Sequence, residues 1–168
     1  MPAWSRDGKW VYFGSDRTGR FEIFKVSPEG GEAVQVTRNG GWGVQVSPDG
    51  KYLYYARTRG PASSGFAVFP EVSLLRMTAG GGEETQVMEG VRERSWAPTA
   101  EGIWFLAAKD EQHPEIRFFD FKTGKSTFVA AISKPVTTGL AISPDGRRLL
   151  FNQLDQQSSE ILLVENFR

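Results

Sequence analysis

A short phrase recurs along this chain: serine, a variable residue, Asp-Gly, and then lysine or arginine. Intact copies occupy residues 5–9, 47–51 and 143–147, and a degraded copy, Ala-Pro-Thr-Ala-Glu-Gly, occupies residues 97–102. The first two copies start 42 residues apart, and the degraded copy starts 46 residues before the last. Repeats of about 40–45 residues are typical of propeller blades built from four strands each. The period therefore constrains the architecture before any single residue is considered.

Strand-like runs surround each copy of the phrase. They are rich in aromatic and β-branched residues and are bounded by Gly, Pro and Asp, and no segment shows helical periodicity with caps. In the turn itself, proline presets φ, aspartate caps the turn and glycine accepts a positive φ. The first strand of each repeat is expected at 4–5, 45–47, 95–96 and 141–143, and the second at 10–13, 52–55, 103–106 and 148–151. The third is expected at 22–26, 73–77, 115–119 and 160–164, and the fourth at 33–37, 85–88 and 126–129. The sequence predicts an all-β chain.

These runs add up to fifteen strands, so the last repeat lacks its outer strand. We predict a single partial β-propeller domain over residues 1–168, with four-stranded antiparallel blades at approximately 1–38, 39–90, 91–132 and 133–168. Exposed blade edges are an aggregation liability. We therefore expect the chain to be part of a larger ring, or to pair with a second copy into a homodimer that closes an eight-bladed ring.

The first repeat carries a recognisable family pattern. Residues 4–37 contain Trp-Ser-x-Asp-Gly-Lys, an aromatic strand, Ser-Asp-Arg-x-Gly, a Glu-Ile-Phe strand and Gly-Gly-x-x-x-x-Val-Thr. This pattern resembles the WD40-like β-propeller repeat of the TolB type found in bacteria, and the other repeats carry it with losses. The resemblance implies a propeller fold and, for TolB-like proteins, a periplasmic scaffold that contacts envelope lipoproteins and peptide segments.

Composition and motif spacing exclude several functions. Twenty basic residues balance twenty acidic ones, which argues against nucleic-acid binding, and no apolar run is long enough for membrane insertion. The chain has no cysteine, and its single histidine, His113, cannot form a histidine-based zinc site. The nearest approach to a nucleophile elbow, residues 60–65, has the wrong spacing, and each Asp-Gly turn offers one carboxylate, too few for calcium. We expect no enzyme activity, no catalytic residue, no metal and no cofactor.

Arginine and tryptophan gather in the loops on one predicted face of the propeller. Both residue types are enriched in binding hot spots, so an anionic small ligand or an acidic peptide would suit this face. The alternative is structural: Trp4 and Trp96 occupy equivalent repeat positions and could pack between blades, and Arg17 follows Asp16 in a salt-bridge pattern. The candidate ligand-binding or partner-binding residues are Arg17, Arg38, Trp42, Arg57, Arg59, Arg92, Arg94 and Trp96.

The sequence leaves three functional readings. The first is a non-catalytic interaction module that binds a protein partner, peptide or small ligand on its loop face or in its channel. The second is the C-terminal sensory propeller of a winged-helix transcriptional regulator, for which the residues 164–168 fit a chain end. The third is the accessory propeller of a prolyl-oligopeptidase-type peptidase. The first predicts a periplasmic location if the chain is TolB-like, and the second a cytoplasmic one.

Overall fold

The computed structural model describes residues 2–58, 71–107 and 114–154. Within these residues the chain forms strands and turns and no helix, so no helix there could cross a membrane. The strands are β1 (Ala3–Trp4), β2 (Val11–Ser15), β3 (Glu22–Val26), β4 (Val34–Gln35), β5 (Trp42–Val46), β6 (Tyr52–Thr58), β7 (Glu71–Thr78), β8 (Thr85–Pro98), β9 (Gly102–Ala107), β10 (Glu115–Asp120), β11 (Lys125–Ala131), β12 (Val136–Ile142) and β13 (Leu149–Gln153).

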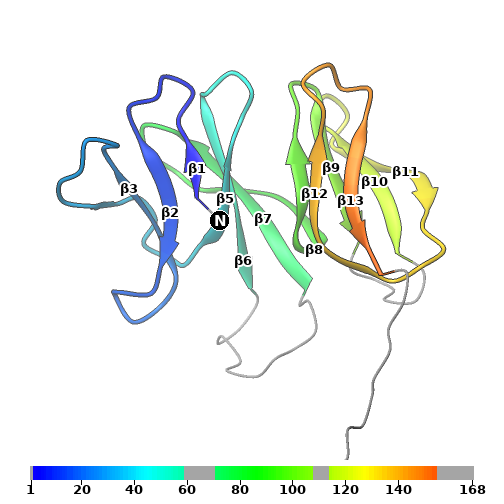
Figure 1. Cartoon of the computed structure of the whole chain (residues 1–168), viewed down its shortest axis with the longest axis horizontal. Coiled ribbons are helices and arrows are strands. Elements are labelled where there is room, and N and C mark those ends of the chain that lie inside the picture. Colours follow the sequence, from blue (N-terminus) through cyan, green and yellow to red (C-terminus); the bar gives the residue numbers. More distant parts are fainter. Residues whose placement is uncertain (1, 59–70, 108–113, 155–168) are drawn as a thin grey trace, which may run out of the picture.

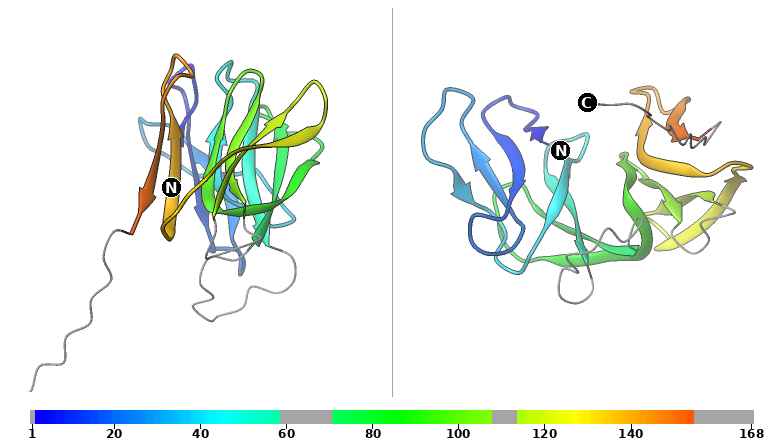
Figure 2. Two further views of the ribbon diagram at one scale, coloured as in Figure 1. Left: turned by 90° about the vertical axis from the view of Figure 1, so that its right-hand side faces the viewer. Right: turned by 60° about the horizontal axis from the view of Figure 1, so that its bottom comes forward.

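Within each sheet, strands that are consecutive in the chain pair antiparallel, which confirms the all-β propeller prediction. Blade 1 consists of β1–β4, and blade 4 contributes the two-stranded sheet β12–β13. Between them, β5 to β11 form one seven-stranded sheet that contains blades 2 and 3. Figures 1 and 2 show the blades following one another around an open arc, with β1, β5, β8 and β12 toward its inner side. The predicted strand at 160–164 lies outside the described residues.

Blades 2 and 3 share one sheet because a single long strand serves both. The sequence predicts separate strands at 85–88 and 95–96, whereas β8 is continuous over 14 residues. Its first part pairs with β7 up to Arg92, its second part pairs with β9 from Val91, and the register shifts between Val91 and Trp96. Gly90 and Arg94 both adopt positive φ, at 75° and 55°, within this stretch. The crossover thus stays extended and bends instead of forming a loop.

The hydrophobic core lies between the blades in three layers. One layer joins Tyr12 and Ile23 of blade 1 to blade 2, a second joins blade 2 to Trp96 of blade 3, and a third joins blade 3 to Leu140 of blade 4. Trp96 is fully buried, and a Cβ on Gly43 would lie 3.2 Å from its ring. Gly43 also has φ of +64°, so both its backbone and the close approach of the indole require glycine there.

A buried carboxylate fixes the exit of the chain from blade 1. Glu22 is 1% exposed and accepts hydrogen bonds from the Thr37 hydroxyl at 2.6 Å, the Gly40 amide at 3.0 Å and the Arg20 guanidinium at 2.7 Å. Thr37 Oγ1 in turn accepts the Ile23 amide at 2.8 Å. A buried charge is tolerated only when it is paired and hydrogen-bonded, and Glu22 meets this condition. The network holds the segment after β4 against β3.

We predict that Thr37→Val lowers the free energy of unfolding by about 1–3 kcal/mol, since it leaves the buried Ile23 amide without its acceptor and removes one of the hydrogen bonds that the Glu22 carboxylate accepts. Urea denaturation followed by tryptophan fluorescence measures the loss. Thr123→Val, in the exposed turn between β10 and β11, is the matched control and is expected to stay within about 0.5 kcal/mol of the parent. Equal effects of the two substitutions would contradict a special role for the Glu22 network.

Candidate functional site

The two ends of the strands define two faces of the arc. The Asp-Gly turns that join β1 to β2, β5 to β6 and β12 to β13 gather on one face, the turn face, together with the β8–β9 turn (Figure 1). The opposite face, the loop face, carries the β2–β3 connection and the crossovers between blades. The loop face is the one on which the sequence predicts the binding residues.

Arg57 of the predicted set is engaged within the protein. Its guanidinium donates to Glu84 Oε2 at 2.7 Å and to the Gly40 carbonyl at 3.0 Å, so it joins the β4–β5 crossover to the turn that precedes β8. Burial acts to raise the pKa of Glu84, but the hydrogen bonds that its carboxylate accepts, that of Arg57 first, together with the positive charge of Arg57 hold this pKa below its usual value. Arg57 therefore has a structural partner on the loop face.

Three other residues of the predicted binding set, Arg17, Arg38 and Trp42, lie in blade 1 or at the start of β5. Arg17 is exposed, but its guanidinium lies over the rings of Phe13 and Phe24, at 5.3 and 4.6 Å from their centroids, and no ion pair to Asp16 is found among the described residues. Trp42 is half-buried beside the layer between blades 2 and 3. Arg38 is exposed, and its carbonyl accepts a hydrogen bond from Arg20.

Arg92, Arg94 and Trp96 of the predicted set lie on β8, and the bend in this strand determines where their side chains lie. Trp96 is fully buried in the second core layer, as the structural alternative predicts, and Arg92 is 4% exposed and donates to the Val136 carbonyl of blade 4 at 3.2 Å. Arg94 is exposed and pairs with the adjacent Glu93 at 3.3 Å. Arg59 lies outside the described residues, as does His113. The expectation that this set gathers on one accessible face is therefore wrong for Trp96 and Arg92, whose side chains are inside the protein.

The turn face is built from one hydrogen-bonding pattern used three times. In each intact copy the serine hydroxyl donates to the aspartate Oδ1 at 2.5–2.6 Å and accepts the amide of the residue five positions later at 2.9 Å. The aspartate also accepts the amide two positions later at 3.1 Å. The glycines have φ between 70° and 75°, a range that strongly favours glycine. The predicted capping role of Asp7, Asp49 and Asp145 is confirmed.

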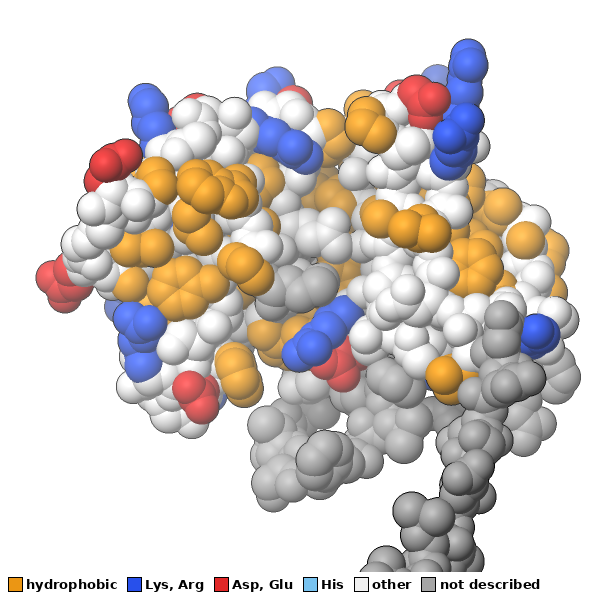
Figure 3. All heavy atoms as spheres, viewed as in Figure 1, with side chains coloured by type: hydrophobic (Ala, Val, Ile, Leu, Met, Phe, Trp, Pro, Cys, Tyr) orange, Lys and Arg blue, Asp and Glu red, His pale blue; other side chains and the backbone are white. Residues whose placement is uncertain are grey.

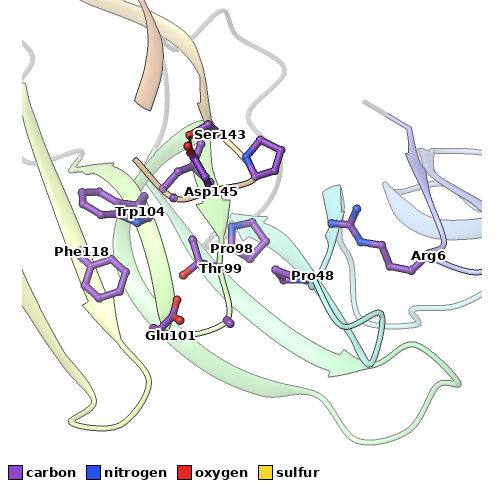
Figure 4. A pocket seen from close by; sticks show the side chains of 13 residues that line it. Arg6, Pro48, Pro98, Thr99, Glu101, Trp104, Phe118, Ser143 and Asp145 are labelled. Atoms are coloured by element: carbon purple, nitrogen blue, oxygen red, sulfur yellow. Dashed lines mark hydrogen bonds between the residues drawn. The ribbon is translucent and has the colours of Figure 1, made fainter. Parts of the chain in front are cut away.

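The second residue of the turn, which follows serine in the three intact copies and Ala97 in the degraded one, lies at a shared place in all four repeats. Arg6, Pro48, Pro98 and Pro144 occupy this second position of the turn, and all four line one hollow of about 790 Å³ on the turn face. Figure 4 shows Arg6 at one end of the hollow and Trp104 and Phe118 at the other. The hollow thus brings together residues that are up to about 140 positions apart in the sequence.

The far end of the hollow combines aromatic rings with a carboxylate. Trp104 and Phe118 lie on the adjacent strands β9 and β10 with ring centroids 5.0 Å apart and planes tilted by 48°. Glu101 lines the same hollow from the β8–β9 turn and is exposed. Arg6 is fixed at the other end because it donates to the carbonyls of Ser47 and Val46 at 3.1 and 3.4 Å. The site combines proline and aromatic surfaces with Arg6 at one end and Glu101 near the other, and Asp145 also lines it.

Sequence reasoning treated the Asp-Gly turns as connections between strands and missed this hollow. The available signal was the second turn position, which is proline in three repeats and arginine in the first. Within residues 2–58, 71–107 and 114–154, no three His, Asp or Glu side chains meet in a geometry that could hold a metal ion.

Comparison with known proteins identifies the fold. No protein-family model matches the chain. An uncharacterized protein from Agrobacterium fabrum is 39% identical over 56 residues, which is 32% of this chain and 19% of that protein. TolB from Acinetobacter baumannii superposes with a TM-score of 0.69 at 18% identity, over 90% of this chain and 36% of that one. A TolB candidate from Agrobacterium tumefaciens gives a TM-score of 0.68 at 17% identity, over 92% and 58%.

Two further solved structures, whose names point to other functions, share the same architecture. A nidogen/laminin complex contains a chain that superposes with a TM-score of 0.67 at 13% identity, over 90% of this chain and 55% of that one. Tricorn protease gives a TM-score of 0.57 at 17% identity, over 90% and 20%. This chain spans less than two-thirds of the length of each of these proteins. It is a β-propeller chain of the TolB-like fold.

We predict that Arg92→Ala lowers the free energy of unfolding by about 1.5–3 kcal/mol, because it removes a buried hydrogen bond from a charged donor to blade 4. Urea denaturation at neutral pH measures the change. Arg38→Ala removes the same side chain from an exposed position and is expected to stay within about 0.5 kcal/mol. If both variants are equally stable, the contact between Arg92 and Val136 does not hold blade 4 in place.

We predict a pH-dependent contribution from the capping aspartates. The hydrogen bond from the Ser47 hydroxyl, and then that from the Lys51 amide, hold the pKa of Asp49 below its ordinary value of 3.8. A carboxylate whose pKa is lower in the folded state stabilises the fold above its unfolded pKa, and this stabilisation disappears as the pH falls through the folded pKa. Asp49→Asn is therefore expected to lower the urea midpoint near pH 7, with a difference from the parent that shrinks below about pH 3.8.

Asp16→Asn, at an exposed position without such bonds among the described residues, is the control for the pH series. Its midpoint should follow the parent at every pH. A difference between Asp49→Asn and the parent that stays constant from pH 7 to pH 3 would contradict the capping explanation.

Proposed function

We propose that this chain is a non-catalytic propeller module that binds an extended peptide segment of a protein partner in the hollow of the turn face. One observation carries the proposal: the second residues of the four turns converge on this hollow, which is about 790 Å³. A cavity of this size falls in the range of ligand-binding sites. It is built from rigid strand ends, so a ligand would meet a preformed surface.

The chemistry of the lining favours a peptide over a small anion. Pro48, Pro98 and Pro144 give rigid apolar surfaces, and Trp104 and Phe118 give aromatic ones. Aromatic surfaces are enriched in the hot spots of protein interfaces because they offer contact area at low entropic cost. Glu101 places a negative charge beside the aromatic end. This combination suits an apolar side chain followed by lysine or arginine, which an aromatic face also attracts.

The polar groups of the hollow support a binding role over catalysis. The Ser143 hydroxyl donates to Asp145 at 2.5 Å and accepts the Arg148 amide at 2.9 Å, and Ser5 and Ser47 repeat this arrangement in the other two turns. A nucleophilic serine needs a base within hydrogen-bond reach, and none of the described residues that line the hollow is a histidine. The serine and aspartate are better explained as turn caps.

Two structural neighbours support a protein partner. The nidogen propeller was solved in complex with laminin, and TolB shares the fold at a TM-score of 0.69. Both are below 20% identity to this chain, so they support the class of ligand and not its identity. The anionic ligand predicted for the loop face stays a prediction.

Selection of a phage-displayed random peptide library against the purified chain tests the proposal. Selected peptides should carry an apolar residue near lysine or arginine, and they should bind in fluorescence polarisation assays. Glu101→Lys reverses the charge of the hollow and Ala100→Trp fills it, so each is expected to weaken binding by at least about tenfold. Glu29→Lys makes the same charge change on an exposed turn outside the hollow and should leave affinity unchanged.

Two results would contradict the proposal. If Arg38→Glu abolishes binding while Glu101→Lys and Ala100→Trp do not, the binding site is on the loop face. If no selected peptide binds the folded chain, the peptide-binding function itself is wrong.

A further inference from the structure

The three core layers between blades use the same two repeat positions. In the strand after each turn, one set of residues packs against the preceding blade: Leu53 and Tyr55, Ile103 and Phe105, and Leu149 and Phe151. The residue between the members of each pair packs against the following blade, as Tyr54 and Trp104 do. Tyr12 occupies this second position in blade 1 and packs against blade 2. Each blade therefore has a backward face, which packs against the preceding blade, and a forward face, which packs against the following blade.

Blade 1 has a backward face without a partner blade among the described residues. Val11 and Phe13 hold the positions of Leu53 and Tyr55, and the register places Trp4 beside Val11 and Phe24 beside Phe13. None of the four belongs to a core layer between blades, but Phe24 is only 4% exposed. Trp4 is 60% exposed. Figure 3 shows hydrophobic side chains gathered over β1–β3 on this side. We refer to these four residues as the open backward face.

Blade 4 presents the complementary surface. Leu150 holds the position of Tyr12, Tyr54 and Trp104, and it is 73% exposed, whereas Tyr12 and Tyr54 are each 2% exposed. Ala141 lies beside Leu150 in the register and is also exposed. We refer to Ala141 and Leu150 as the open forward face. A single chain thus carries both halves of the interface that it uses three times internally.

We propose that the open backward face binds the open forward face of a second copy of this chain. Each contact would repeat the internal packing, with Leu150 of one copy taking the place that Tyr12 takes against Leu53 and Tyr55 in the layer between blades 1 and 2. The arc is open on one side (Figure 2), and two copies joined head to tail would make two equivalent contacts and close into one ring if each arc covers half of it. No charged side chain belongs to either set, and the charged group found against them among the described residues is the Arg17 guanidinium, which lies over Phe13 and Phe24.

The Arg17 side chain covers part of the open backward face. Its guanidinium stacks over Phe13 and Phe24 and donates through Nε to the Ser15 hydroxyl at 3.0 Å, all within blade 1. Arginine can remain stacked on an aromatic ring at an interface, because it is more weakly hydrated than lysine. The stacked arginine therefore shields two rings in the free chain and remains compatible with an arriving blade.

Light scattering after size exclusion, over a range of protein concentrations, tests the proposal. The expected mass is twice the 18.7 kDa of one chain. Trp4→Asp and Leu150→Asp alter opposite faces, and each should weaken dimerisation by at least about a hundredfold, because a carboxylate would be buried in an apolar contact. Phe128→Asp changes a side chain that is 55% exposed on β11, outside both faces, and should leave the dimer intact. Circular dichroism of each variant establishes that it folds.

Cross-linking distinguishes the head-to-tail contact from other dimers. The chain has no cysteine, so Val11→Cys and Leu150→Cys can be made separately without interference. A short bismaleimide should link the two variants to each other when they are mixed, and it should give little product with either variant alone. A folded chain that is monomeric at every concentration would overturn the proposal. So would products from either variant alone, or open-ended oligomers of rising mass. The result is independent of peptide binding on the turn face.

Discussion

Packing between successive blades is the constraint on which the rest of this structure depends. The apolar side chains lie in three layers, each shared by two neighbouring blades, so no blade buries its own surface alone. In such repeat architectures, stability is approximately a sum of repeat and nearest-neighbour contributions. A blade at the end of the described arc therefore keeps one face exposed, and Trp4 and Leu150 are the result. The same packing sets the spacing of the turns that surround the hollow.

The sequence predicted the strands and turns well because their causes are local. A serine, an aspartate and a glycine within four positions are sufficient to form the capped turn, and the structure repeats it with hydrogen bonds of nearly equal length in three copies. The strand at 85–98 was the main difference, since the sequence predicts two strands there and the chain forms one. Whether a crossover loops out or stays extended depends on packing between blades, which residues 89–94 alone do not specify.

The candidate site could not be predicted in the same way because its causes are not local. Arg57 and Glu84 are 27 residues apart, and only the fold brings them within 2.7 Å. Arg92 appears in the sequence as one of several loop arginines, but the bend in β8 turns it inward to Val136. Likewise, four turn residues that look like spacers line one hollow once the blades are arranged around the arc. Composition identified residues suited to binding, while the fold decided which of them are accessible.

Arg6 is the one residue at the second turn position that is not proline, and it makes the two ends of the hollow differ in charge. Pro48, Pro98 and Pro144 carry no charge, whereas Arg6 reaches across to the carbonyls of Val46 and Ser47 in blade 2. This contact ties the first turn to the second, and it places Arg6, the basic side chain among the described lining residues, at the end opposite Trp104 and Phe118. Glu101 lies nearer the aromatic end. A peptide bound between them would meet opposite charges at its two ends, and these charges would favour one orientation of the peptide over the other.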